Sequence, residues 1–247
     1  MLELARLSKA FGGVRAVDEL TLDLPRGGVF GLIGPNGSGK TTIINLISGL
    51  YTPTSGEILF EGAKIGGMPS HRIVRRGVAR TFQNMRLFSE LSVEDNIRVF
   101  QAPHARNIGD WLGTRQMRGN SPLHEKVEEL LHSLALTKLR REMAGNLSLG
   151  EQKRLEIARA LATEPTLLLL DEPAGGMSFQ EIEALGEFLR NLVAKGLTIM
   201  LVEHNMRFVM AIAQRIAVLN FGRLIACGSP QEIRSNRTVV EAYLGNE

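Results

Sequence analysis

Cysteine, aromatic residues and long apolar runs are all scarce in this chain. Cys227 is the only cysteine among 247 residues, so no internal disulfide can form, and the composition suits a reducing compartment. Aromatic residues make up 5% of the chain, and no window approaches the roughly 18 apolar residues that a membrane-spanning helix needs. The acid Glu3 lies where a secretory signal would carry bases, so we expect neither a signal peptide nor a membrane span.

An excess of charge of one sign is also lacking. The 29 basic and 26 acidic residues give a formal net charge of +3, which by itself gives no argument for a nucleic-acid partner. Hydrophobic residues at 44% and charged residues at 22% are typical of a globular protein. We find no internal repeat and no low-complexity segment. The length allows one large α/β domain or two small ones, and any role at a membrane must come through a partner.

The most informative stretch is Gly34–Thr41, which fits the phosphate-binding pattern G-x-x-x-x-G-K-[ST]. The apolar run Val29–Ile33 before it predicts a buried strand, and Thr42–Ile47 after it predicts a helix packed on a sheet. In that context Gly37 and Gly39 can adopt backbone angles closed to other residues. Consecutive backbone N–H groups can then surround a phosphate.

Two side chains at the end of this loop add charge and a metal ligand. Lys40 would neutralise the β- and γ-phosphates of a nucleotide, and the Thr41 hydroxyl would hold Mg²⁺. The following helix presents its positive N-terminal end to the same anion. The alternative is a glycine-rich turn that matches the pattern by chance, and the flanking strand and helix argue against it.

The remaining pattern predicts two kinds of strand. Alternation at Leu2–Leu7 and Thr21–Leu24 predicts antiparallel strands with one solvated face, separated by a glycine turn over Phe11–Val17. Unbroken apolar runs at Leu167–Leu170 and Leu197–Val202 predict central strands in parallel, joined by a right-handed crossover. Further strands are expected at Glu57–Phe60, Val78–Phe82, Ile216–Leu219 and Arg223–Ala226.

Serine caps predict where several helices start. Ser92, Ser148, Ser178 and Ser229 each precede an acid three residues later, as in a capping box. The helices that start at Ser92, Ser148 and Ser178 are expected to end near Phe100, Ala162 and Ala194, and the one at Ser229 is a terminal helix from Pro230. Two further helices are expected over Leu123–Leu136 and, short and basic, over His71–Arg76. A loop or irregular helix is expected over Ala102–Gly119. We therefore expect a single domain over 1–247. Residues from about 92 to 164 would form a helical subdomain inserted between the core segments of about 1–91 and 165–247.

Carboxylates follow the first central strand. Asp171 and Glu172 lie at its carboxyl end, where α/β folds bind ligands. Asp171 is placed to hold the Mg²⁺ shell, and Glu172 is then free to polarise a water against the γ-phosphate. The alternative is that one of the two merely caps the next turn.

Three further side chains are weaker candidates when taken singly. Gln83 follows a strand and can hydrogen-bond Mg²⁺ ligands and water, although a lone Gln is usually solvated. His204 follows the second central strand and could act at the γ-phosphate, or be a structural histidine. Phe11 could stack on a base, or be an ordinary core aromatic.

Taken in order, these elements resemble the ATP-binding subunits of ABC transporters. The chain shows the phosphate loop, Gln83, the signature-like Leu147–Glu151, the strand ending in Asp171-Glu172, and His204. The signature is similar to the family's LSGGQ, with Leu149 in place of a glycine and Glu151 in place of a glutamine. Glu151 also fits a capping box with Ser148. The implied fold is an α/β P-loop NTPase core with a mixed sheet, an N-terminal antiparallel β-subdomain and an inserted α-helical subdomain.

The resemblance also implies roles for residues. Catalytic roles fall on Lys40, Gln83, Glu172 and His204, and Mg²⁺ ligation falls on Thr41, Gln83 and Asp171. ATP would be bound by Phe11, Val17, Gly34, Asn36, Gly37, Ser38, Gly39, Lys40, Thr41 and Thr42 of one subunit. Ser148, Gly150 and Glu151 would contact the ATP on the opposite subunit, across an interface that includes the loop from Gly175 to Ser178.

Several stretches narrow the resemblance to the branched-chain amino-acid uptake group. They are Ala79–Phe88, Asp171–Met177, Glu203–Met206 and Val240–Gly245, and urea and amide importers share much of them. Such a subunit would pair with a second ATP-binding subunit, identical or related, and with integral membrane permease subunits at the cytoplasmic face of the inner membrane. An extracytoplasmic solute-binding protein would act indirectly. In such importers the surface around Met85 to Val99 receives a short cytoplasmic helix of the permease.

Two other functions use the same loop. A nucleic-acid- or ribosome-associated ATPase of this superfamily usually carries long coiled-coil insertions or two nucleotide domains, and this chain has neither. A small-molecule kinase would leave Ser148–Glu151 and His204 without a role. The basic set Arg72, Arg75, Arg76, Arg80 and Arg86 is open to two interpretations: a solvated face, or a contact with anionic lipid or an acidic permease loop.

Overall fold

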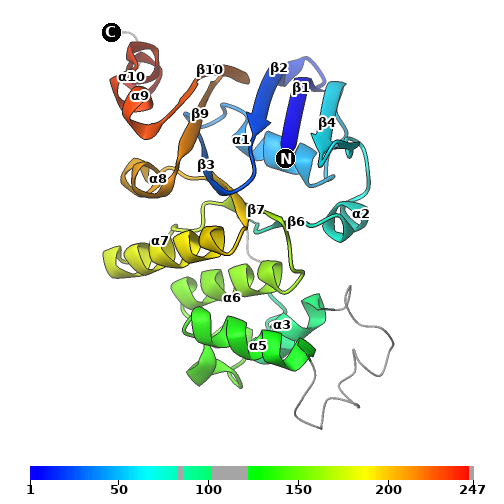
Figure 1. Ribbon diagram of the computed structural model, residues 1–247, viewed down its shortest axis with the longest axis vertical. Helices are drawn as coiled ribbons and strands as arrows, with labels where there is room; N and C mark the ends of the chain where they lie inside the picture. Colours follow the sequence, from blue (N-terminus) through cyan, green and yellow to red (C-terminus); the bar gives the residue numbers. More distant parts are fainter. Residues whose placement is uncertain (83–85, 102–121, 245–247) are drawn as a thin grey trace.

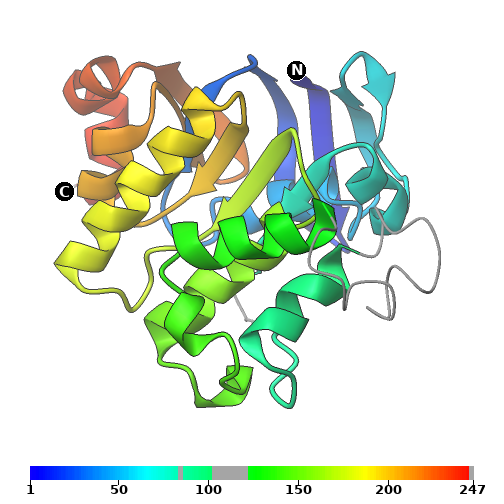
Figure 2. The same ribbon diagram turned by 60° about the horizontal axis from the view of Figure 1, so that its bottom comes forward.

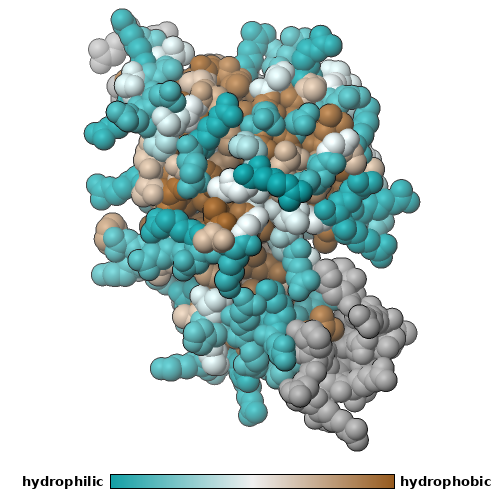
Figure 3. Space-filling view, viewed as in Figure 1, coloured by the Kyte–Doolittle hydropathy of each residue, from teal (hydrophilic) through white to brown (hydrophobic). Residues whose placement is uncertain are grey.

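Two β-sheets lie next to each other, and helices cover the larger one (Figure 1). This computed structural model describes residues 1–82, 86–101 and 122–244. The predicted loop or irregular helix over Ala102–Gly119 lies outside the described residues, as does Gln83. Apolar side chains gather over the upper, sheet-containing part of the face seen in Figure 3, while its lower end is mostly hydrophilic.

The smaller sheet is antiparallel and has the strand order β2-β1-β4-β5. Its strands are β1 (Leu2–Phe11), β2 (Val14–Leu24), β4 (Ser55–Phe60) and β5 (Ala63–Lys64). Leu2 pairs with Leu24 and Leu4 with Leu22, and all four side chains are buried. The alternating pattern therefore predicted the buried face correctly.

The strands β1 and β2 are longer than the alternation indicates. They continue to a tight turn at Gly12, whose φ is +57°, so the predicted glycine turn is shorter than Phe11–Val17. Register shifts between the two strands interrupt the strict alternation over this stretch. A bulge places two residues opposite one, so a period of two is lost from the sequence there.

The larger sheet has the order β10-β9-β3-β8-β7-β6. Its strands are β3 (Gly28–Ile33), β6 (Val78–Arg80), β7 (Leu167–Asp171), β8 (Thr198–Val202), β9 (Arg215–Asn220) and β10 (Arg223–Gly228). The pairs from β9 to β6 are parallel and β10 is antiparallel to β9, so the sheet is mixed, as predicted. All residues of β7 and β8 are buried, which confirms the apolar runs as central strands.

The helices mostly begin at the predicted caps. They are α1 (Lys40–Ile47), α2 (Ser70–Arg75), α3 (Val93–Phe100), α5 (Pro122–Ser133), α6 (Leu149–Leu161), α7 (Phe179–Ala194), α8 (Met206–Ile212), α9 (Pro230–Ser235) and α10 (Arg237–Leu244), with short 3₁₀ turns η2 (Thr137–Leu139) and η3 (Ala144–Asn146). Ser148, Ser178 and Ser229 each form a complete capping box with the predicted glutamate. Ser92 caps α3 by accepting from the Asp95 N–H.

Helices α3, α5 and α6 lie together at one end of the molecule (Figure 2). Ile97, Leu131 and Leu155, one from each helix, are fully buried in a cluster that also contains Leu168 of β7. The helical group therefore shares its core with one face of the larger sheet. Helices α8 and α10 were not predicted. They have 7 and 8 residues, which is too short for a helical apolar period to be recognised in the sequence.

Candidate active site

The phosphate loop joins β3 to α1, and its glycines occupy conformations that other residues rarely adopt. The φ angles of Gly34, Gly37 and Gly39 are +152°, +78° and +103°. A Cβ on Gly39 would lie 2.5 Å from the Ala16 carbonyl oxygen, whereas a Cβ on Gly37 would meet nothing within 4 Å. The loop is thus packed tightly at its end and open at Gly37, where a ligand can approach the backbone.

Lys40 is held by the loop that precedes it. Its Nζ donates to the carbonyl oxygens of Gly34, at 2.7 Å, and Pro35, at 2.9 Å. Burial lowers the pKa of Lys40, while the carboxylates of Glu172 and Asp171 act in the opposite direction. The hydroxyl of Ser38 is also buried, and within the described part of the chain it has no hydrogen-bond partner. Both groups are therefore placed to exchange or gain a partner when an anion enters.

A cavity of about 520 Å³ lies over this loop. It is lined by Ala16, Asn36, Gly37, Gly39, Lys40, Thr41, Thr42, Glu172 and His204. The structure thus brings together residues from the loop and from the ends of β7 and β8, which the sequence placed at the same edge of a parallel sheet. Ala16 is the one lining residue that the sequence did not indicate.

Glu172 and His204 contact each other at the wall of this cavity. His204 Nε2 lies 2.6 Å from Glu172 Oε1, which is a hydrogen-bond distance. Glu172 has a φ of +52°, uncommon for a residue with a side chain. Its N–H donates to the Val202 carbonyl at 2.9 Å, and its carbonyl accepts from Lys153 Nζ at 2.8 Å. The local backbone is therefore held in a strained conformation by contacts on both sides.

Asp171 is almost completely buried, with 1% of its surface exposed. Within the described residues neither of its carboxylate oxygens makes a hydrogen bond, and Arg80 Nη2 is 3.8 Å from Oδ2. Burial raises the pKa of Asp171, and the Arg80 guanidinium opposes that change. Two carboxylate oxygens left without hydrogen bonds, on the residue that precedes Glu172 of the phosphate cavity, are the hard ligands that Mg²⁺ or its bound waters prefer. The donor set therefore fits a divalent cation.

Arg80 does not belong to the exposed basic set in which its sequence position placed it. Its side chain is 9% exposed and donates to Asn45 Oδ1 at 2.7 Å and Ser48 Oγ at 2.9 Å. Arg72, Arg75 and Arg76 are exposed, as a solvated face requires. Burial lowers the pKa of Arg80, and the Asp171 carboxylate is the main opposing influence. Arg80 is a structural partner of the site rather than a lipid-facing charge.

Phe11 and Val17 do not line the cavity. The Phe11 ring is 42% exposed and meets the Tyr51 ring edge-on, with centroids 5.1 Å apart, so it is not a core aromatic. Val17 is fully buried in the core, and its neighbour Ala16 faces the cavity instead. The exposed ring of Phe11 is available to stack on a base, whereas the side chain of Val17 is not accessible.

The signature residues lie at the start of α6 and do not line the cavity of the same chain. The Ser148 hydroxyl lies 2.8 Å from Glu151 Oε2, which also accepts the Ser148 N–H at 2.8 Å. These hydrogen bonds, the hydroxyl's first, lower the pKa of Glu151. A Cβ on Gly150 would lie 2.6 Å from Glu181 Oε1, and Leu149 packs over Gly176. Glu151 is therefore a helix cap, and both departures from the family's signature have local partners.

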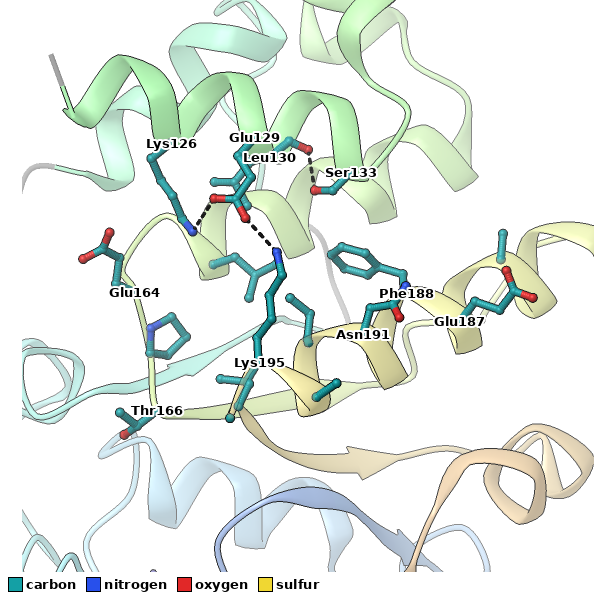
Figure 4. Close-up of a pocket in the computed structure, with 17 residues that line it drawn as sticks. Lys126, Glu129, Leu130, Ser133, Glu164, Thr166, Glu187, Phe188, Asn191 and Lys195 are labelled. Carbon is teal, nitrogen blue, oxygen red and sulfur yellow. Dashed lines mark hydrogen bonds and ion pairs between the residues drawn. The ribbon is translucent and has the colours of Figure 1, made fainter. Parts of the chain in front are cut away.

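A second, larger cavity of about 930 Å³ lies between α5 and α7 (Figure 4). Lys126 and Lys195 both bind the Glu129 carboxylate, each at 3.0 Å, so the two lysines of this cavity share one carboxylate. It shares no lining residue with the phosphate cavity.

None of the helices in the described part of the chain combines the length and the apolar character that a membrane span needs.

Comparisons with known proteins identify the family of the chain. A family model described as ABC transporter matches residues 17–175, and one described as Branched-chain amino acid ATP-binding cassette transporter matches residues 223–247. The chain is 40% identical over 249 residues to the high-affinity branched-chain amino acid transport ATP-binding proteins BraF of Pseudomonas aeruginosa and LivG of Escherichia coli. Each alignment covers 99% of this chain and 98% of the relative.

Solved structures give the same result. A nucleotide-free ATP-binding cassette from an ABC transporter superposes with a TM-score of 0.87 at 30% identity, covering 100% of this chain and 99% of that one. The ADP conformation of an ATP-binding cassette of an ABC transporter gives a TM-score of 0.86 at 30% identity, with the same coverage. Sequence, fold and site together show that the chain belongs to the ABC transporter family, as an ATP-hydrolysing cassette.

Proposed function

We propose that this protein hydrolyses ATP to drive the import of branched-chain amino acids through a membrane permease. Support comes from two relatives named for that transport, each 40% identical over nearly the whole chain, and from the C-terminal match over residues 223–247. The observation that carries the hydrolytic part is the Glu172–His204 contact of 2.6 Å at the wall of the phosphate cavity. It joins a general base to a group that can orient it, next to the loop that binds phosphate.

The phosphate loop would bind the β- and γ-phosphates of ATP. A Cβ on Gly37 would meet nothing within 4 Å, so a phosphate can approach the backbone there, and the N-terminus of α1 begins at Lys40. Lys40 would leave its two carbonyl partners for the phosphates, and Ser38 would gain the partner that its buried hydroxyl lacks. Phe11, the last residue of β1, would stack on the adenine with its exposed side chain. Asn36 and Thr42 would line the same phosphate cavity.

Asp171 and Thr41 would hold Mg²⁺, with Gln83 as a further ligand to it or to its waters. When bound, the cation supplies positive charge against the phosphate oxygens. The chain's own contribution is a buried carboxylate whose two oxygens make no hydrogen bond within the described residues. The neighbouring guanidinium of Arg80, at 3.8 Å, would keep that carboxylate oriented toward the ion.

Glu172 would accept a proton from the attacking water, or orient it, in line with the γ-phosphate. As a base Glu172 is an ionised carboxylate that only accepts hydrogen bonds, so His204 Nε2–H would donate to Glu172 Oε1 and fix the direction of that carboxylate. The exposed side chain of His204 can also reach the γ-phosphate edge, since it lines the same cavity. Positioning and charge stabilisation, rather than covalent chemistry, would supply most of the rate.

The complete site would require a second subunit. Ser148, Gly150 and Glu151 do not line the phosphate cavity of their own chain, yet Ser148 caps a helix whose N-terminus is exposed. That N-terminus would bind the γ-phosphate held by the opposite subunit. The helical subdomain of about 92–164 would then carry the signature of each subunit toward the phosphate loop of the other. The second subunit would be a copy of this chain or a related one.

Closure of this dimer would pull on membrane permease subunits at the cytoplasmic face of the inner membrane. The exposed side of the segment near Phe88 and α3 is the surface to which the family resemblance assigns a short permease helix, and Phe88 is 46% exposed there. Met85, at one end of that surface, lies outside the described residues. A solute-binding protein on the other side of the membrane would deliver the amino acid, and no nucleic acid would be involved.

Replacing the base tests the hydrolytic site. We expect Glu172→Gln to bind ATP with near wild-type affinity and to lose about 10²- to 10⁴-fold in turnover, because no side chain would deprotonate the water. Phosphate release and equilibrium ATP binding measure the two quantities. Glu187→Gln, the same change on an exposed part of α7, should leave both unchanged. Turnover near wild type in Glu172→Gln would remove Glu172 from its role.

The solute is tested on the intact membrane complex. Pull-down of the tagged chain should recover membrane subunits, and leucine with its binding protein should raise the ATPase rate of the reconstituted complex. Urea and acetamide, tested in the same way, should leave the rate at its basal level. Stimulation by urea or acetamide instead of leucine would reassign the solute while leaving the ATPase assignment intact.

A further inference from the structure

Glu203 is a buried carboxylate that binds only backbone in the part of the chain that the structure describes. It lies directly after β8, and 4% of its surface is exposed. Its Oε1 accepts the Ala174 N–H at 2.8 Å, and its Oε2 accepts the His204 N–H at 3.0 Å and the Asn205 N–H at 3.2 Å. No ion pair with a described basic side chain accompanies these three hydrogen bonds. Hydrogen bonds to an ionised acceptor are stronger than neutral ones, and they offset the cost of burying the charge.

The N–H groups that it binds come from two different loops. Ala174 lies two residues after Glu172, in the loop that follows β7, whereas His204 and Asn205 follow β8. One side chain therefore connects the ends of the two neighbouring strands that carry the base and the histidine. Asn205 in turn caps α8 by accepting the Phe208 N–H at 3.1 Å, so the same anchor fixes the start of that helix.

The conformation of Glu172 needs such an anchor. A residue with a side chain at a φ of +52° is strained, and it persists only where surrounding contacts impose it. Two hydrogen bonds hold the backbone of Glu172 itself: its N–H donates to Val202 of β8, and its carbonyl accepts from Lys153 of α6. The hydrogen bond from the Ala174 N–H to Glu203 holds the backbone two residues after Glu172.

We propose that Glu203 is a positioning residue that holds Glu172 and His204 at the distance and orientation that hydrolysis requires. This positioning role rests on the proposed function, in which Glu172 and His204 act on the attacking water and the γ-phosphate. Only an ionised carboxylate offers enough lone pairs on two oxygens for three N–H donors. A glutamine has one acceptor oxygen and would turn an N–H group toward one of these donors. An aspartate keeps both oxygens but is one methylene too short to reach both loops.

The test compares Glu203→Gln with wild type in the full-length chain. We expect turnover under saturating ATP to fall about 10²-fold, since a misplacement of about 1 Å costs that much, while ATP affinity stays within about twofold. Glu203→Asp should retain the fold and show an intermediate loss of turnover. Wild-type turnover in Glu203→Gln, or an equal loss of ATP affinity and turnover, would overturn the inference.

A double-mutant comparison separates positioning from a merely structural role. If Glu203 acts through Glu172, adding Glu203→Gln to Glu172→Gln should lower the residual turnover by less than about twofold, because coupled residues are not additive. A full further loss of about 10²-fold in that background would contradict a role through Glu172. Should Glu203→Gln fail to fold, the same comparison is made with Glu203→Asp, and additive losses there would also overturn the inference.

The proposed function fails in a distinguishable way. Wild-type turnover in Glu172→Gln alone would refute the proposed base, whatever Glu203 does. Lost turnover in Glu172→Gln together with wild-type turnover in Glu203→Gln would refute only the positioning role.

Discussion

Glycines of the phosphate loop are required for different physical reasons, and the structure separates them. Gly39 has a left-handed conformation and no room for a methyl group, because the Ala16 carbonyl oxygen would be 2.5 Å from its Cβ. Gly37 also has a positive φ, but a methyl group there would point into open space. The first position is closed by the protein, and the second is kept open for the ligand.

This difference gives a prediction at two neighbouring positions. Gly37→Ala should cost about 1–2 kcal/mol of stability from its left-handed backbone, while the new methyl group crowds the phosphate and weakens ATP binding. Gly39→Ala should weaken ATP binding too and should cost about 2 kcal/mol more in stability, because the backbone contact must also move. That difference corresponds to about 4–8 °C in melting temperature for a chain of this size. Differential scanning fluorimetry and ATP titration measure both effects, and equal melting temperatures would contradict the packing explanation.

Residue positions were predictable where a motif fixed them and not where the partner is distant in sequence. Lys40, Glu172 and His204 lie around one cavity, as the phosphate loop and the two strand ends indicated. The burial of Arg80 beside Asp171 was missed, because its partner is 91 positions away and its sequence neighbours are basic. Ala16 was missed for a related reason: β2 brings it to the loop through a register that bulges alter.

At the scale of elements, capping residues predicted helix starts better than apolar periodicity predicted helix ends. The three serine capping boxes formed with the predicted glutamates. The helix predicted over Leu123–Leu136 ends at Ser133, because Ala135 turns into a left-handed conformation with φ of +54° while Leu136 remains buried. An N-terminal cap is a hydrogen bond between residues three apart, so a local sequence pattern predicts it. The end of a helix depends instead on what the following residues pack against.

The capping box of α6 gives a prediction with a defined pH window. Hydrogen bonds from the Ser148 hydroxyl and N–H lower the pKa of Glu151 below its usual 4.5. A carboxyl that holds its proton less tightly when folded stabilises the protein above the unfolded pKa, and that contribution is lost as the pH falls through the folded value. Glu151→Gln keeps a capping side chain without a titratable group.

We therefore expect Glu151→Gln to be less stable than wild type by up to about 1 kcal/mol at pH 7, or roughly 2–4 °C. The difference should shrink as the pH falls below the unfolded value and through the lowered pKa of Glu151, where the wild-type carboxyl becomes protonated. Thermal melts of both proteins across this range measure it. Glu183→Gln, an exposed position of α7 outside any capping box, should show no such trend. A difference that stays constant from pH 7 to pH 3.5 would show that the charge of Glu151 does not contribute.

At the scale of the whole molecule, the phosphate loop and the signature residues that we propose as the other half of the site lie apart on one chain. The phosphate loop, Glu172 and His204 share a cavity, and the cap of α6 at Ser148 is absent from it. The sequence predicted the fold class and the parallel pairing of the two central strands, since apolar runs and the crossover connection constrain them strongly. It could not predict how α3, α5 and α6 pack on the sheet, because that depends on side chains from three helices meeting at once.

In the proposed function, this separation would make hydrolysis depend on an encounter between two chains. Ser148→Arg should abolish turnover by placing a bulky cation at the cap that would bind the opposite γ-phosphate, while ATP binding to the intact phosphate loop remains. Lys40→Ala should also abolish turnover, because the phosphate loop loses its charged side chain while the cap at Ser148 stays intact. Mixed in equal amounts, the two variants should regain at most about a quarter of the wild-type rate, since half of the dimers are mixed and each has one working site of two. Phosphate release from the separate and mixed proteins measures this, and the wild-type rate per molecule should rise with protein concentration. Full turnover by Ser148→Arg alone, or no recovery on mixing two folded variants, would contradict a site shared between two chains. The coupling of hydrolysis to dimer closure would then have no structural basis.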